Sequence, residues 1–207
     1  MSFPTTPDAF RDFARARLDA LPPSDAFLLA SSDFALSGEA PDLPKPRAAA
    51  VLAPIVAHAD GFTMLLTERA TGLRAHSGQI AFPGGKIDPG ETPLETALRE
   101  AEEEIGLERA LVEPLGWLDP YSTGTGFRIA PLVALVRPGF ALTINRGEVA
   151  DAFETPLDFL MDEANHQIHE RDIGGRKRRF YAMPHGERYI WGATAGMLRN
   201  LWERLKA

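Results

Sequence analysis

The sequence contains no cysteine among its 207 residues. Disulfide bonds, thiolate zinc sites and cysteine nucleophiles are therefore excluded, and a reducing compartment is compatible with the chain. The chain also lacks an uncharged stretch of about 18 residues, the length that a membrane-spanning helix needs. Its N-terminus has no basic region followed by an apolar run, as a secretory signal would have. We therefore expect a cytoplasmic protein without a membrane anchor.

The chain has few basic residues relative to acidic ones, with 22 Lys and Arg against 29 Asp and Glu. The resulting net charge of −7 argues against a surface that binds polyanions, so no nucleic-acid partner is expected. An anionic small molecule would need local arginines or a metal ion for its binding. The length fits one domain of ordinary size with an extension, and its core should be ample.

The first part of the chain differs in pattern from the rest. Residues 7–20 place apolar side chains at helical spacing among charges, which predicts an amphipathic helix. Residues 21–47 are rich in Pro, Ser, Asp and Ala with little periodicity, which indicates an extended connection. We expect residues 1–46 to pack as an extension on one domain formed by residues 47–207. A homodimer through the N-terminal helix or a sheet edge is possible, although no motif in the sequence supports it.

The domain should combine a mixed central sheet with helices on both faces. Residues 48–58 and 62–69 are apolar and β-branched on either side of a turn, which predicts a central hairpin. Strands and helices that alternate in this way are typical of an α/β/α sandwich. The remaining expected strands are 111–118, 127–136, 148–153, 168–173 and 178–183, and further helices are expected at 156–161 and 192–205.

The most informative stretch is residues 85–107, which predicts a loop, a helix and a loop. Thr92 is the expected N-cap, with Glu95 as its capping-box partner and Pro93 at the first helical position. Gly106 marks the end of the helix. The apolar face expected for this helix consists of Leu94, Ala97, Leu98, Ala101 and Ile105.

Three acids of this helix stand at positions i, i+3 and i+4, namely Glu100, Glu103 and Glu104. Their carboxylates should project from one patch of the helix surface, where they repel one another. Glu103 and Glu104 also oppose the helix dipole, so stability alone does not favour the arrangement. Two interpretations remain: a solvated acidic face, or oxygen ligands for Mg²⁺ or Mn²⁺ that also meet substrate phosphates.

The surrounding residues favour the second interpretation, because the segment resembles the Nudix box. That box requires a Gly, a Glu, an Arg-Glu pair, a small residue, a Glu-Glu pair, a Gly and an aliphatic residue at fixed spacing. The matching residues are Gly85, Glu91, Arg99, Glu100, Ala101, Glu103, Glu104, Gly106 and Leu107. The resemblance implies a metal-dependent hydrolase of the Nudix family with the fold of an α/β/α sandwich.

Two arginines precede the box. Arg69 ends an expected strand and Arg74 lies in the following loop. Two guanidiniums beside a metal site suit a diphosphate that bears an additional phosphate, since Arg binds phosphate oxygens in bidentate fashion. Alternatively, they are surface arginines held by nearby acids such as Glu68 and Asp88.

The same stretch looks like the signature of the coenzyme A pyrophosphatases within the Nudix family. The matching residues are Leu65, Leu66, Thr67, Arg69, Ala70, Arg74, Gly78, Phe82, Pro83, Gly84 and Gly85. This resemblance implies cleavage of the diphosphate of coenzyme A, or of its acyl or oxidised forms, to 3′,5′-ADP and 4′-phosphopantetheine or its derivative. It also implies substrate contacts from Arg69, Arg74, Gly78 and Phe82.

The resemblance further implies roles for the box residues. Glu100 and Glu104, with Glu103 beside them, would hold divalent ions, and the carbonyl of Gly85 would be an additional ligand. Arg99 would pair with Glu91 or Glu103 and so orient a carboxylate. The candidates for the general base are Glu103 and Glu148, the latter from a loop that follows Asn145.

Two rival functions remain at this point. The enzyme would act on ADP-ribose, NADH or a dinucleoside polyphosphate, all of which contain a diphosphate. Alternatively, the chain would be a Nudix-fold module that binds a nucleotide without hydrolysing it. Such modules are expected to have lost box carboxylates, whereas all of those named above are present.

Overall fold

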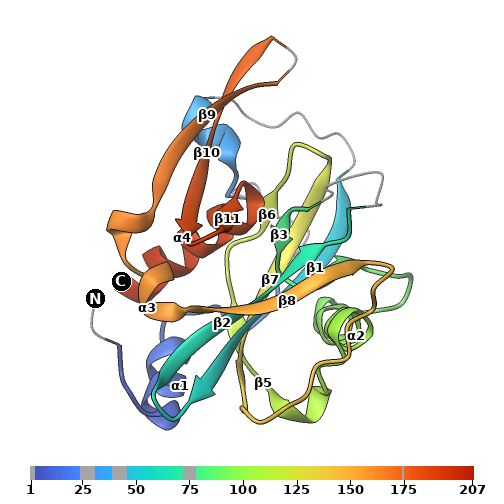
Figure 1. The fold of residues 1–207 in the computed structure, drawn as a ribbon, viewed down its shortest axis with the longest axis vertical. Helices are drawn as coiled ribbons and strands as arrows, with labels where there is room; N and C mark the ends of the chain where they lie inside the picture. The colour runs from blue at the N-terminus through green and yellow to red at the C-terminus, as the bar shows by residue number, and fades with distance from the viewer. Residues whose placement is uncertain (1–2, 24–30, 39–45, 72–77, 174) are drawn as a thin grey trace.

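A computed structural model of the chain describes residues 3–23, 31–38, 46–71, 78–173 and 175–207. Its main feature is a central sheet with helices on both sides, and a second, smaller sheet stands beside the first at the top of Figure 1. The candidate functional site described below lies between these two sheets and the helix that contains residues 93–105.

The central sheet has eight strands in a mixed arrangement. Its main path runs β3-β2-β1-β7-β5, while β4 pairs with β1, β6 with β7 and β8 with β2. Only β1 and β7 are parallel, which confirms the expected mixed sheet. The strands are β1 (Arg47–His58), β2 (Gly61–Arg69), β3 (Ile80–Ala81), β4 (Gly84–Lys86), β5 (Val112–Trp117), β6 (Tyr121–Ser122), β7 (Phe127–Val136) and β8 (Val149–Pro156).

The second sheet is antiparallel, with the order β11-β10-β9. Its strands are β9 (Gln167–Ile173), β10 (Arg176–His185) and β11 (Arg188–Trp191). The helices are α1 (Pro7–Arg15), α2 (Pro93–Ile105), α3 (Leu157–Leu160) and α4 (Ala193–Lys206), with short 3₁₀ turns η1 (Asp33–Ser37), η2 (Arg109–Leu111) and η3 (Glu163–Asn165). Across the described parts of the chain, no helix is both long and apolar enough to cross a membrane.

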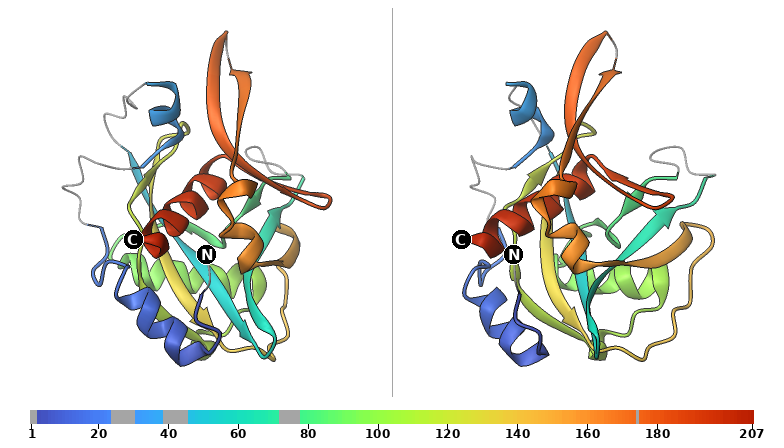
Figure 2. Two further views of the ribbon diagram at one scale, coloured as in Figure 1. Left: turned by 90° about the vertical axis from the view of Figure 1, so that its left-hand side faces the viewer. Right: turned by 60° about the vertical axis from the view of Figure 1, so that its left-hand side comes forward.

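Alternating side chains of β1 build the two halves of the core, because successive residues of a strand point to opposite faces. Ala50 and Leu52 belong to the cluster that contains the buried residues of α2. Val51, Ala53 and Ile55 belong to the other cluster, together with α1 and α4. Figure 2 accordingly shows α4 on one side of the central sheet and α2 on the opposite side. The layered α/β/α arrangement is confirmed.

The caps of α2 agree with the prediction. The Thr92 side chain accepts a hydrogen bond from Glu95 N at 3.2 Å, and the Glu95 side chain accepts one from Thr92 N at 2.8 Å. Gly106 ends the helix with φ of 70°, a left-handed conformation that glycine adopts without a steric penalty.

The predicted apolar face of α2 is wrong at one position. Leu94 is 37% exposed, whereas Thr96 and Glu104 are buried together with Ala97 and Ala101. At about 100° per residue, Leu94 lies within about 20° of both Ala101 and Ile105, which are buried, so its exposure follows from its place in the first turn of the helix and not from its direction. The buried side of α2 extends further around the helix than the predicted apolar face and includes Thr96 and Glu104.

The N-terminal segment packs on the sheets in two places. Phe10 of α1 contacts Phe62 of β2, with 4.5 Å between ring centroids. Further along, η1 lies against β10, where Arg179 N donates to the Ser37 side chain at 3.2 Å. α1 ends at Arg15, earlier than the predicted helix, which extended to residue 20.

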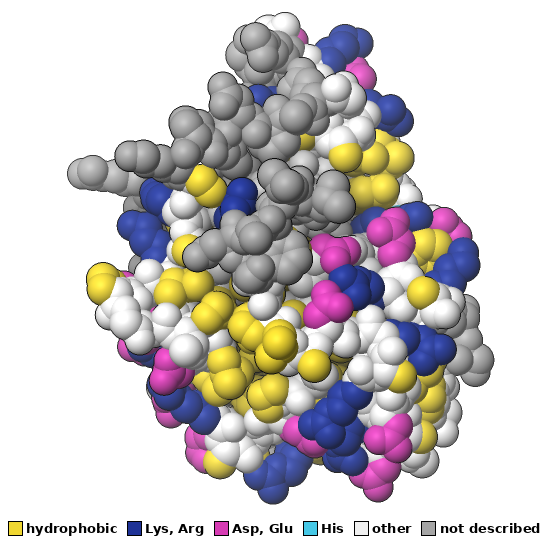
Figure 3. Space-filling view, turned by 180° about the vertical axis from the view of Figure 1, so that it is seen from behind, with side chains coloured by type: hydrophobic (Ala, Val, Ile, Leu, Met, Phe, Trp, Pro, Cys, Tyr) yellow, Lys and Arg dark blue, Asp and Glu magenta, His cyan; other side chains and the backbone are white. Residues whose placement is uncertain are grey.

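The surface seen from behind mixes both signs of charge (Figure 3). Basic and acidic side chains alternate along its lower edge, and hydrophobic side chains gather above them. The side chains coloured on this face form no broad patch of one sign. The net negative charge is therefore spread over many residues on this face.

One acid is partly buried where η1 meets the central sheet. Asp33 lies against the hydroxyl of Tyr121, a side chain that is only 2% exposed. Burial raises the pKa of Asp33 from its ordinary value of 3.8 to about 6, while contacts with Tyr121 and the Tyr181 backbone oppose the shift. The folded protein therefore holds this proton more tightly than the unfolded chain does.

We expect this carboxylate to lower the stability of the protein as the pH rises from about 4 to about 6. Within that window the folded state binds more protons than the unfolded state, so a rise in pH favours unfolding. Above it both states are ionised, and the loss in the free energy of unfolding is complete at about 3 kcal/mol. Asp33→Asn should therefore stabilise the protein at pH 7.5 and have little effect at pH 4, as measured by denaturant unfolding.

The control is Asp12→Asn, which changes an exposed acid of α1. It should shift the midpoint of unfolding little at either pH. A stability gain from Asp33→Asn that is equal at pH 4 and pH 7.5 would contradict the assignment of the effect to charge.

Candidate active site

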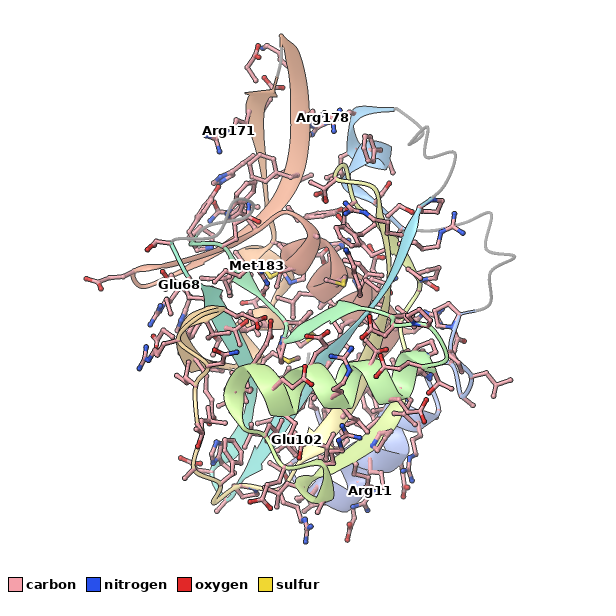
Figure 4. The ribbon with its side chains drawn as sticks, turned by 90° about the vertical axis from the view of Figure 1, so that its right-hand side faces the viewer. Arg11, Glu68, Glu102, Arg171, Arg178 and Met183 are labelled. Atoms are coloured by element: carbon pink, nitrogen blue, oxygen red, sulfur yellow. The ribbon has the colours of Figure 1, made fainter. Side chains whose placement is uncertain are left out.

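A cavity of about 800 Å³ lies between the central sheet, α2 and the second sheet. In Figure 4, α2 and β4 lie below it, while η1 and the hairpin of β9 and β10 stand above. Residues from distant parts of the chain line it, including the box segment, β1, the turn before β8, and β10. The acidic side chains gather at the α2 end of this cavity.

Two glycines let β4 lie against its neighbours. A Cβ atom on Gly85 would stand 2.3 Å from Oε1 of Glu100, and one on Gly84 would stand 2.5 Å from the carbonyl oxygen of Ala50. A side chain at Gly85 would therefore displace the carboxylate of Glu100, and one at Gly84 would collide with the backbone of β1. The missing side chains bring the backbone of β4 directly beside the carboxylates of α2.

Glu104 is the most buried acid of the site, at 3% exposure. Its carboxylate accepts a hydrogen bond from Gly84 N at 3.2 Å and lies 3.8 Å from Nη1 of Arg69. Burial nevertheless raises the pKa of Glu104 to about 7, and the nearby charges of Glu100 and Glu148 add to the shift. The hydrogen bond from Gly84 and the guanidinium of Arg69 therefore do not fully replace the hydration that the Glu104 carboxylate loses on burial.

Glu100 and Glu148 bring two further carboxylates to the same cavity. Burial raises the pKa of Glu100, and Arg99, which donates to it at 3.0 Å, opposes the shift. Glu148 lies in the turn before β8, where Asn145 Nδ2 donates to its carboxylate at 3.2 Å. Acids from two separate segments thus meet at one end of the cavity.

Arg99 connects the acids that lie beside the cavity. Its guanidinium binds Glu91 in bidentate fashion, at 2.7 and 3.0 Å, and donates to Glu103 at 2.9 Å. The hydrogen bonds from Arg99, followed by that from Thr96, lower the pKa of Glu91 to about 2. The side chain of Glu103 is 57% exposed and does not line the cavity.

The acidic end suits a hard divalent cation in its chemistry. In the described parts of the chain, no three acidic or histidine side chains stand close enough to hold a metal ion as they are placed. Each carboxylate has its own protein donor, and Glu100 would have to turn from Arg99 toward the cavity. Its oxygen donors and under-compensated negative charge nevertheless match what Mg²⁺ and Mn²⁺ bind.

The residues predicted to contact substrate are distributed unevenly. Arg69 and Phe82 line the cavity, Arg69 on the side of Glu104. Gly78 does not line it, and its N–H closes the turn onto the carbonyl of Arg69 at 3.1 Å. Arg74 lies outside the described residues.

Sequence reasoning missed the opposite end of the cavity. Arg47, Arg178 and Arg179 line that end, together with Phe34 of η1. The only sequence signal was the basic run at 176–179, which resembles an ordinary charged hairpin. The predicted extension also contributes a wall here, for which its irregular sequence gave no hint.

Comparison with known proteins assigns the family. A family model described as the NUDIX domain matches residues 46–173. A protein of Yersinia enterocolitica described as an uncharacterized Nudix hydrolase, NudL, is 42% identical over 158 residues, which are 76% of this chain and 80% of the relative. The protein of the same description from Photorhabdus laumondii is 38% identical over 161 residues, covering 77% of this chain and 86% of the relative.

Solved structures of low sequence identity share the fold. A MutT protein of Methanosarcina mazei is 18% identical with a TM-score of 0.51, covering 80% of this chain and 96% of that one. A MutT/nudix family protein of Enterococcus faecalis is 16% identical with a TM-score of 0.51, covering 99% of this chain and 76% of that one. The fold, the family model and the relatives agree, and the chain belongs to the Nudix hydrolases, pyrophosphohydrolases that generally use divalent metal ions and act on nucleotide-type substrates.

Proposed function

We propose that the protein hydrolyses the diphosphate bond of coenzyme A, or of its acyl or oxidised forms. The products would be 3′,5′-ADP and 4′-phosphopantetheine or its derivative. One observation carries this proposal: the signature of residues 65–85 ends in the cavity wall. Its residues Arg69, Phe82, Gly84 and Gly85 line the same cavity as the box acids Glu100 and Glu104.

The reaction requires water to attack one phosphorus of the P–O–P bridge. A new P–O bond forms, the bridging oxygen leaves with the other phosphate, and a proton is released. Divalent ions, when bound, would neutralise phosphate oxygens and acidify a bound water. Glu100 and Glu104 are the proposed ligands, with Glu103 and the Gly85 carbonyl as the additional ligands that the family pattern suggests.

The remaining residues would position the reacting groups. Arg69 is 3.8 Å from Glu104, so its guanidinium is suited to the diphosphate itself. Arg99 would position Glu100 and Glu103 through the contacts that it makes with both. Contacts of Arg74 and Gly78 with substrate remain predictions from the signature alone.

Glu148 is the better supported of the two candidates for the general base. Its side chain lines the cavity, whereas Glu103 is engaged by Arg99 at 2.9 Å outside it. We therefore assign proton removal from water to Glu148.

Product analysis tests the proposed function directly. Pure protein incubated with coenzyme A and Mn²⁺ in ¹⁸O-labelled water should give 3′,5′-ADP and 4′-phosphopantetheine, with label on only one product. The position of the label identifies the attacked phosphorus. Faster turnover of ADP-ribose, NADH or a dinucleoside polyphosphate, compared by kcat/KM, would instead support the rival substrates.

Glu104→Gln should reduce kcat by at least about 100-fold, because it removes a negative charge from the proposed metal ligands while it preserves shape. Binding of Mn²⁺, followed by calorimetry, should weaken in parallel. The matched control is Glu102→Gln on the same helix, whose exposed side chain pairs with Arg109 and lies on the side of α2 away from the hairpin (Figure 4). Normal turnover by a folded Glu104→Gln protein would eliminate this ligand.

Glu148→Gln should lower kcat by about 100-fold or more and leave the affinity for Mn²⁺ within a few-fold, as loss of a general base requires. Glu103→Gln is the comparison variant. If Glu103→Gln lowers kcat at unchanged metal affinity and Glu148→Gln does not, then Glu103 is the base and the present assignment is wrong.

A further inference from the structure

The cavity has opposite charges at its two ends. Three carboxylates line the α2 end, as described above, whereas the far end is lined by Arg47, Arg178 and Arg179. Asp33 is the acid that lines the far end within the described residues, so positive charge exceeds negative charge there. A ligand that spans the cavity would therefore carry its diphosphate at one end and a further anion at the other.

Two of the three arginines at the far end already have structural partners. Arg47 donates to the carbonyl of Thr125 at 2.8 Å and stacks on Phe127. Arg179 donates to the carbonyl of Leu36 at 3.3 Å and so holds η1 on the hairpin. Arg178 is therefore the arginine whose donors remain to be explained.

The side chain of Arg178 lies between the hairpin and η1 (Figure 4). Its guanidinium carbon is 4.9 Å from the ring centroid of Phe34. Its Nε is buried without a hydrogen-bond partner among the described residues. Nη1 lies 3.0 Å from where a Cβ atom of Gly124 would be, so this glycine leaves space beside the guanidinium. A buried donor without an acceptor costs free energy, so this guanidinium is held without full compensation of its donors, and an arriving anion would bind the part of it that lines the cavity.

Strand β1 relates the two ends of the cavity. Ala50 pairs with Gly85, which lies against Glu100, and Arg47 stands three residues earlier on the same strand. At about 3.3 Å per residue, these two positions are roughly 10 Å apart. The far end is therefore in reach of a group on the nucleoside half of a substrate whose diphosphate lies beside Glu100.

We propose that Arg178 is a specificity residue that binds a phosphate monoester on the nucleoside half of the substrate. The inference rests on the proposed function, since that substrate carries a phosphate monoester on its ribose in addition to the diphosphate. A guanidinium in a partly buried site is the side chain best matched to such a dianion. Arg178 lies beyond residues 46–173, outside the segment that the family model matches.

The test compares coenzyme A with dephospho-coenzyme A, which lacks only the monoester. Arg178→Gln should raise KM for coenzyme A by about 10-fold or more, as loss of a charge-assisted hydrogen bond predicts, with kcat within about twofold. KM for dephospho-coenzyme A should not change. Arg178→Lys should restore part of the discrimination. The control is Arg171→Gln. Arg171 is an exposed arginine that stands opposite Arg178 in the register of β9 and β10 and does not line the cavity.

Equal losses on both substrates, or no loss on either, would overturn the proposal while leaving the hydrolase function intact. Loss of discrimination in Arg74→Gln but not in Arg178→Gln would overturn it as well. If the wild-type protein cleaves neither substrate, the proposed function fails, and calorimetry with 3′,5′-ADP and 5′-AMP decides the inference. A preference for 3′,5′-ADP that Arg178→Gln abolishes would sustain it, and equal binding of the two would refute it.

Discussion

The close approach of β4 to α2 is the constraint on which the acidic site depends. A side chain on Gly85 would occupy the space of the Glu100 carboxylate, and one on Gly84 would collide with β1. On the face of the sheet that α2 covers, Ala97 and Ala101 pack with Ala50 and Leu52 of β1 and are small enough to let the helix lie close to the sheet. The backbone of the strand and the acids of the helix are therefore brought together by missing side-chain atoms.

That approach has an electrostatic cost. Glu104 is buried against β4, and its pKa is raised to about 7 even though Gly84 N–H and Arg69 both stabilise its charge. Arg99 acts in the opposite sense on Glu91, whose pKa it lowers to about 2. The loop before α2 thus carries a carboxylate whose pKa is lowered and the helix carries one whose pKa is raised, and of these two only Glu104 lines the cavity. Such a division suits a site in which a cation supplies the missing compensation.

Local signals predicted the parts of the fold that depend on local interactions. The caps of α2 and the hairpin of β1 and β2 follow from short motifs, and both are present. Short strands such as β3 and β6, of two residues each, have no periodicity to detect. Leu94 was misplaced because helical spacing gives the direction of a side chain but not whether the first turn of the helix lies over the sheet. The arginine-lined end of the cavity was not predicted, because its walls come from η1, the loop at Gly124 and β10, which only the tertiary structure brings together.

The wall around Arg178 comes from segments at both ends of the chain, η1 before the matched domain and β10 after it. The acids that would carry out the hydrolysis lie on α2 and the turn before β8, well inside that domain. Under the proposed roles, one residue that selects the substrate and the acids that cleave the bond are therefore encoded in separate stretches of the gene. On this arrangement, substitutions in the flanking stretches would change which nucleotide is bound without disturbing the acids of the box, so chains that share the box could differ in substrate.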